Sequence, residues 1–150
     1  MANRALAVLI GGAACGVLDA LAATIDFGMR GVPFMRLWQG VASGALGRSS
    51  FQHGAVSAAL GLFFHFLIAM TAALVFNVIA KYAPTLLDHF ILSGIGYGVV
   101  VYVFMNFVVI PLSALPPRTF SLSGTVKGIV VHMICVGLPI TTATYWFSKK

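Results

Sequence analysis

Four polar side chains inside otherwise apolar runs are the residues of this chain best suited to chemistry. They are Asp19, His65, Asn106 and His132. Carboxylate and imidazole groups exchange protons and bind polar ligands. An ionisable group at bilayer depth costs roughly 2.5 to 3.5 kcal/mol on insertion scales, so such groups usually pair, face a wet cavity or serve a function. We therefore predict that these four side chains bind a ligand or protons.

Four further polar residues are predicted to lie at the mouth of that site, nearer to the membrane surface. They are Asp26, Arg36, Gln39 and Arg118. Arginine presents a planar fork of donors that suits anions. Either Arg36 or Arg118 would therefore meet an anion at the mouth.

Cofactor binding is an alternative that the histidines leave open. His65 and His132 could be the paired imidazole ligands of a b-type haem. His132 and Cys135, spaced i and i+3, could instead form a metal site of mixed softness with His65 and Asp19. Two histidines are weak evidence for either site, so the main expectation includes no cofactor. No serine lies in a nucleophile-elbow motif next to a histidine, and the sequence favours a role other than catalysis.

The composition indicates what must position these side chains. Of 150 residues, 60% are hydrophobic and 8% are charged, whereas soluble domains are about half apolar and about a quarter charged. A soluble protein is excluded. A transmembrane helix needs about 20 mostly apolar residues, and four runs qualify. The prediction is one all-α transmembrane domain over 1–150, a four-helix up-down bundle with spans at 5–29, 54–80, 89–111 and 124–147.

The segment between the first two runs is too polar and too rich in glycine to span. Within it, 33–46 has proline at its start and Phe34, Leu37, Trp38 and Val41 at helical intervals. It is predicted to be a short interfacial or re-entrant helix.

The net charge of +6 comes from nine lysines and arginines scattered at the ends of apolar runs. That distribution is typical of membrane-edge anchors and argues against nucleic-acid binding.

An up-down bundle puts the four polar side chains in one layer. At a helical rise of about 1.5 Å per residue, Asp19 lies about 13 Å and His65 about 16 Å from the side of the first and third loops. On the same scale, Asn106 lies about 8 Å and His132 about 12 Å deep. The opposite half of the bundle is predicted to be almost entirely apolar. The layer is either a polar pocket covered by 33–46 or a neutral interhelical hydrogen-bond network that only holds the bundle.

Two stretches carry a resemblance to a known family. The first is 37–47 followed by Phe51, Gly54 and His65; the second is 105–113 followed by Pro116, His132 and 137–139. These motifs resemble a family of small four-span bacterial inner-membrane proteins of unknown function. The resemblance implies four spans in the bacterial plasma membrane and no particular activity. Trp38 and Gly40 depart from it, since polar or small aliphatic residues are more usual there.

Two functional classes follow from these observations. The first is small-solute or proton-coupled transport or binding through the one-sided polar pocket. The second is a structural or accessory subunit, in a homo-oligomer or larger membrane complex, whose small-residue faces pack against partners. In both, the lipid bilayer surrounds the protein. Four basic residues near span ends on the side of the termini against five on the other side leave the orientation open.

Overall fold

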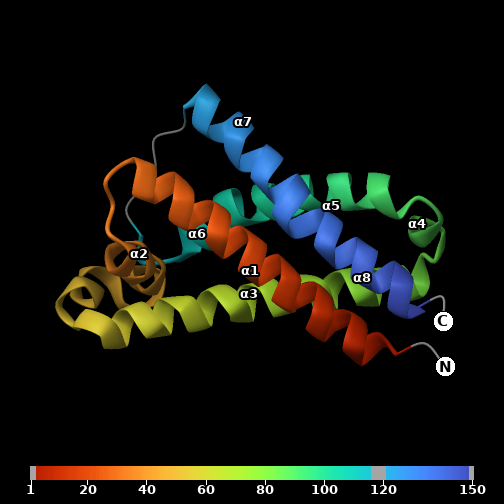
Figure 1. Ribbon diagram of the computed structural model, residues 1–150, viewed down its shortest axis with the longest axis horizontal. Coiled ribbons are helices and arrows are strands. Elements are labelled where there is room, and N and C mark those ends of the chain that lie inside the picture. Colours follow the sequence, from red (N-terminus) through yellow and green to blue (C-terminus); the bar gives the residue numbers. More distant parts are fainter. Residues whose placement is uncertain (1–2, 116–120, 149–150) are drawn as a thin grey trace.

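The computed structural model describes residues 3–115 and 121–148, and these residues form helices and turns with no strand (Figure 1). The four long apolar helices predicted from the sequence are present. They are α1 (Arg4–Met29), α3 (Gly54–Tyr82), a third from Phe90 to Leu112 and a fourth from Leu122 to Ser148. Each is long and apolar enough to cross a membrane. Together they suggest a multi-pass membrane protein.

The third and fourth helices each contain a widened π-helical turn. The third consists of α5 (Phe90–Phe104), the π turn η2 (Met105–Val109) and α6 (Ile110–Leu112). The fourth consists of α7 (Leu122–Val131), the π turn η3 (His132–Gly137) and α8 (Leu138–Ser148). Proline lacks an N–H group and its ring crowds the carbonyl four residues earlier. Pro111 and Pro139 each come two residues after a π turn, which explains where the helices widen.

The four helices alternate in direction along the chain, and the N and C ends lie at the same end of the molecule (Figure 1). There, the Asn3 N–H donates to the Phe147 carbonyl at 3.0 Å. Helix α1 lies between α3 and α8 and contacts both closely through glycines. A Cβ added at Gly16 would lie 2.6 Å from the Phe66 ring of α3, and one at Gly11 would lie 3.1 Å from Ala143 of α8. These small residues of the first span therefore face the neighbouring helices.

Helix α5 meets η3 with the two backbones in contact. A Cβ at Gly98 would collide with the His132 carbonyl, and one at Gly137 would collide with the Gly94 carbonyl. Small residues permit this approach between helices. Away from these contacts, large apolar side chains cover the outside, with Leu92 71% and Leu122 83% exposed. Such a surface suits lipid rather than water.

A helix is also present where the sequence predicts a short one. Helix α2 (Phe34–Leu46) continues into a 3₁₀ segment, η1 (Gly47–Gln52), and packs across the beginning of α3. Leu37, Trp38 and Ala42 are buried in this contact. Gly61 of α3 lies against the carbonyl of Trp38, where any Cβ would collide with it. At the other end of the molecule, the single turn α4 (Thr85–Asp88) connects α3 to α5.

Candidate functional site

A polar cavity of about 380 Å³ lies between α1, the third helix and the fourth helix. Three of the four predicted site residues line it, namely Asp19, Asn106 and His132. Asp26, predicted at the mouth, lines it as well. The other polar side chains of this cavity are not among the predicted site residues; they are Arg30, Tyr102, Ser121, Thr125 and Lys127.

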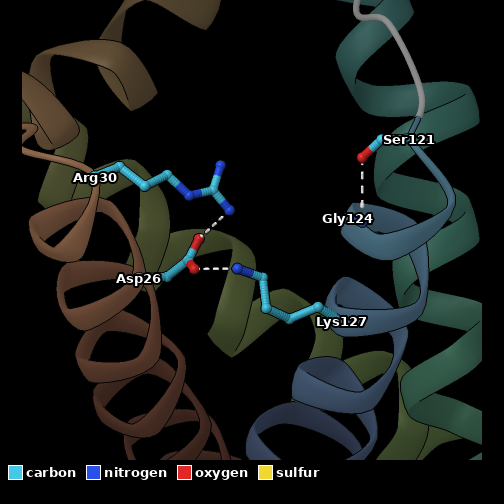
Figure 2. Close-up of polar contacts among 5 residues, drawn as sticks. All are labelled: Asp26, Arg30, Ser121, Gly124 and Lys127. Atoms are coloured by element: carbon cyan, nitrogen blue, oxygen red, sulfur yellow. Dashed lines mark hydrogen bonds and ion pairs between the residues drawn. The ribbon is translucent and has the colours of Figure 1, made fainter.

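An ion-pair cluster joins α1 to α7 at this cavity. Asp26 accepts a hydrogen bond from Lys127 of α7, and it forms an ion pair at 2.7 Å with Arg30, the residue that follows α1 (Figure 2). The Lys127 and Arg30 side chains are 49% and 54% exposed, so the cluster lies near the surface. We call these three residues the α1–α7 tether. Beside it, the Ser121 hydroxyl accepts the Gly124 N–H at 3.2 Å and caps α7 (Figure 2).

A second cavity of about 600 Å³ lies between α1, α2, α3 and the η2–α6 segment. Its described lining is mostly apolar, and the ionisable side chains in it are Asp19, Arg36 and His65. Three residues of α1, spaced four apart, line both cavities: Asp19, Ala23 and Phe27. The two cavities therefore share a wall, and Asp19 is the charged residue in it.

His65 lies next to Asp19 with a defined tautomer. Its Nε2 is 2.8 Å from the carbonyl oxygen of Gly16. A carbonyl can only accept, so Nε2 carries the hydrogen and Nδ1 of the neutral ring is a proton acceptor. Nδ1 is 4.0 Å from Asp19 Oδ2, and the two side chains are 15% and 23% exposed. Two proton acceptors face each other across this gap. A proton on either one converts repulsion between lone pairs into attraction.

His132 also has one nitrogen bound to a backbone carbonyl. Its Nδ1 is 2.9 Å from the Gly128 carbonyl, which leaves Nε2 of the neutral ring as an acceptor. Asn106 donates through Nδ2 to the Tyr102 carbonyl at 2.9 Å. In the described part of the chain, neither Asn106 nor His132 bonds to another helix. The alternative of an interhelical hydrogen-bond network is therefore supported at His65, which links α3 to α1, and not at these two residues.

The residues predicted at the mouth have different places. Gln39 is 3% exposed and lines neither cavity, because its Nε2 donates to the Gly54 carbonyl at 2.9 Å. It holds α2 against the start of α3, away from the place at the mouth that the sequence predicts for it. Arg36 is exposed at the apolar cavity, with its guanidinium carbon 5.1 Å from the centre of the Phe51 ring. Arg118 lies outside the described residues.

The cofactor alternatives gain no geometric support. His65 lines the apolar cavity and His132 lines the polar one, so the two imidazoles do not face a common space that a haem would fill. Within residues 3–115 and 121–148, no three His, Cys, Asp or Glu side chains come together in a group that could hold a metal ion. The described part of the chain therefore contains no metal-binding group made of Cys135, the two histidines and Asp19.

The opposite half of the bundle contains a buried polar contact that the sequence analysis missed. Asn77 is 3% exposed, and its Nδ2 donates to Thr144 Oγ1 at 2.9 Å. Arg4 donates to the Asn77 carbonyl at 3.0 Å. The expectation of an almost entirely apolar half is therefore wrong here. The sequence contains an indication of this contact, since Asn77 is a polar residue within the second apolar run.

Comparisons of the chain with protein families, with curated proteins and with solved structures found no match. Fold and site alone therefore define the class. The chain is an all-helical protein with four helices long and apolar enough to cross a membrane, and with a polar and an apolar cavity that share the wall containing Asp19.

Proposed function

We propose that this chain is a multi-pass protein of the bacterial plasma membrane, related to the small four-span family that its motifs resemble. The four long helices are the spans. Helix α2 has 13 residues, too few to cross a hydrocarbon core about 30 Å thick, and we assign it to the interface. Its buried Trp38 side and its exposed Phe34 and Met35 support that place, because aromatic and amphipathic segments favour the headgroup region.

Within this protein, we propose that the polar cavity binds a small polar solute and that binding is coupled to proton movement, as in a transporter. The observation that carries the proposal is the position of Asp19. It lines both cavities and faces Nδ1 of His65, the bare nitrogen of that ring. Intramembrane chains of carboxylates and histidines are common proton relays. A single proton held between Asp19 and His65 would respond to any solute that enters beside Asp19.

The other lining groups give the cavity a route to the surface and a choice of contacts. His132 presents Nε2 as a second proton acceptor, and Asn106 offers its amide oxygen. At the mouth, Asp26 binds both Arg30 and Lys127, and two cations against one carboxylate leave this cluster with a net positive charge. A solute entering by this route would exchange contacts with the α1–α7 tether before it reaches Asp19. An anion would meet the two cations first.

Proton flux into vesicles tests whether Asp19 belongs to a proton relay, and this part of the proposal can be tested without knowledge of the solute. Purified protein is reconstituted in liposomes containing a pH-sensitive dye, and a potassium gradient with valinomycin imposes a membrane potential. We expect the wild-type protein to carry protons inward and Asp19→Asn to abolish the flux. Asp88→Asn is the matched control, because this carboxylate belongs to α4 at the opposite end of the molecule and lines neither cavity.

Two results would contradict the proposal. One is a flux through Asp19→Asn equal to that through the control variant. The other is wild-type protein that carries no protons. The second result, together with loss of stability on purification without a partner, would support the accessory-subunit alternative. That alternative is favoured by the His65 bond to Gly16, since an interhelical bond also serves a purely structural bundle.

A further inference from the structure

The apolar cavity has the size and lining of a ligand site that a polar solute would not fill. Its volume of about 600 Å³ falls within the 300 to 1,000 Å³, roughly, of small-molecule pockets. Its walls come from residues such as Leu37, Val41, Phe64, Ile68 and Val109. Hydrocarbon is the chemistry that these walls match, because burying apolar surface is the favourable term they offer.

Arg36 places a positive charge at this apolar cavity. The residue is exposed and lines the cavity, and its guanidinium stacks over the Phe51 ring of η1. Of the described carboxylates, Asp19 also lines this cavity and faces His65 Nδ1 at 4.0 Å. Asp26 belongs to the α1–α7 tether, and Asp88 lies in α4 at the far end of the bundle. No described carboxylate forms an ion pair with Arg36. The cavity therefore combines a hydrocarbon-lined interior with a cation that forms no ion pair within residues 3–115 and 121–148.

We infer that this cavity binds an anionic phospholipid, with one acyl chain among the apolar walls and the phosphate headgroup at Arg36. Such a lipid matches both the apolar lining and the positive charge of Arg36. Arginine binds phosphate through its fork of donors, and stacking on Phe51 holds the guanidinium in place for that contact. The inference rests on the membrane location proposed above. It does not require proton coupling, so the two proposals fail separately.

Two glycines give a matched pair of probes for the cavity. A Cβ added at either Gly40 or Gly96 meets no atom within 4 Å, so both positions tolerate a larger side chain. Gly40 lines the apolar cavity, whereas Gly96 in α5 lines neither the apolar nor the polar cavity. Leucine at position 40 would occupy space that the acyl chain needs. Leucine at position 96 adds the same bulk elsewhere.

Trp38 provides a direct readout, because it lines the cavity and the chain has two tryptophans. In a Trp146→Phe background, Trp38 is the sole tryptophan. Phospholipids with brominated acyl chains, either anionic phosphatidylglycerol or zwitterionic phosphatidylcholine, are titrated into the protein in detergent. Bromine quenches indole fluorescence only at close range. The measurement therefore reports a chain in the cavity and requires no activity.

We expect phosphatidylglycerol to reach half-maximal quenching at a concentration about fivefold lower than phosphatidylcholine, the preference that one cationic side chain typically gives for an anionic lipid. Arg36→Gln should remove this preference, while Arg48→Gln, whose side chain lines neither cavity, should keep it. Gly40→Leu should abolish the saturable quenching that Gly96→Leu retains.

Three outcomes would overturn the inference. Equal quenching by the two lipids in the parent protein would exclude the headgroup contact at Arg36. Equal quenching in Gly40→Leu and Gly96→Leu, with both variants monodisperse and helical, would exclude a chain in the cavity. A dimer that forms through this face, shields Trp38 from both lipids and dissociates in Gly40→Leu would identify a second copy of the chain as the occupant instead.

Discussion

Gly61→Ala is the substitution that tests most directly how α2 is held over α3. The added methyl would collide with the Trp38 carbonyl oxygen and would lie 2.8 Å from the Trp38 carbonyl carbon and 3.1 Å from the Ala42 nitrogen. Ordinary contact begins at 3.4 Å, so α2 must retreat by 0.6 Å even to relieve the carbon contact. All three atoms belong to the backbone. No side-chain rotation can absorb the change, and the helix must move as a unit.

The expected cost follows from this geometry. Overpacking of a close contact costs about 1 to 3 kcal/mol, and replacing glycine by alanine inside a helix returns about 1 kcal/mol. Gly40→Ala in α2 has the same propensity gain and no neighbour within 4 Å of its Cβ. The difference between the two variants therefore isolates the overpacking term, and Gly61→Ala should be less stable than Gly40→Ala by about 1 to 3 kcal/mol.

Unfolding by sodium dodecyl sulfate in mixed micelles, followed by far-ultraviolet circular dichroism, measures this difference. Hydrogen exchange should also be faster in α2 of Gly61→Ala, because the retreat weakens the contact that buries Leu37 and Trp38. Stabilities of the two variants within about 0.5 kcal/mol of each other, the range of neutral surface changes, would refute the close α2–α3 contact. The description of α2 as a wall of the apolar cavity would be refuted as well.

Two other substitutions address the remaining helix contacts. Gly137→Ala would drive a methyl into the Gly94 carbonyl. We expect it to lower the free energy of unfolding by about 1 to 3 kcal/mol relative to Gly96→Ala, whose Cβ meets open space. Equal stability of the two variants would contradict the backbone contact between α5 and η3. Lys127→Met removes the cross-helix arm of the α1–α7 tether. Because Lys127 is 49% exposed, the loss of stability should stay below about 1 kcal/mol. Hydrogen exchange in α7 should nevertheless become faster than in the Lys81→Met control, and unchanged exchange would show that the tether does not hold α7.

The four long helices and the short one were predictable because run length and polarity determine them almost alone. An apolar run of about 20 residues has few alternatives to a helix in lipid, where every backbone polar group must be satisfied internally. The glycine-facing contacts were predictable for a related reason. Gly12 and Gly16, or Gly94 and Gly98, are four residues apart and must share a helix face. Both pairs meet neighbouring helices in the structure.

The division of the polar layer into two cavities was not predictable. Depth along a helix places Asp19, His65 and His132 at similar levels, but it does not say on which side of α1 each neighbour lies. The rotation of each helix about its axis decides that, and rotation depends on packing. The same limit explains Gln39, which shares the depth of the mouth but points into the α2–α3 contact. The pairing of Asp26 with Lys127 spans 101 positions of sequence and depends on the approach of two helices.

One face of the third helix meets two different demands. The third helix presents Gly94 and Gly98 of α5 to the fourth helix, and Asn106 of η2 lines the polar cavity. In a continuous α-helix each residue advances by about 100°, so one extra residue in a turn rotates everything beyond it by about that angle. The π turn before Pro111 supplies this residue at 105–109, and the π turn before Pro139 supplies it at 132–137. Asn106 and His132 both lie within these widened turns. Gly94, Gly98, Tyr102 and Asn106 are spaced four residues apart, so one face of the third helix packs against the fourth helix near its start and lines the polar cavity further along.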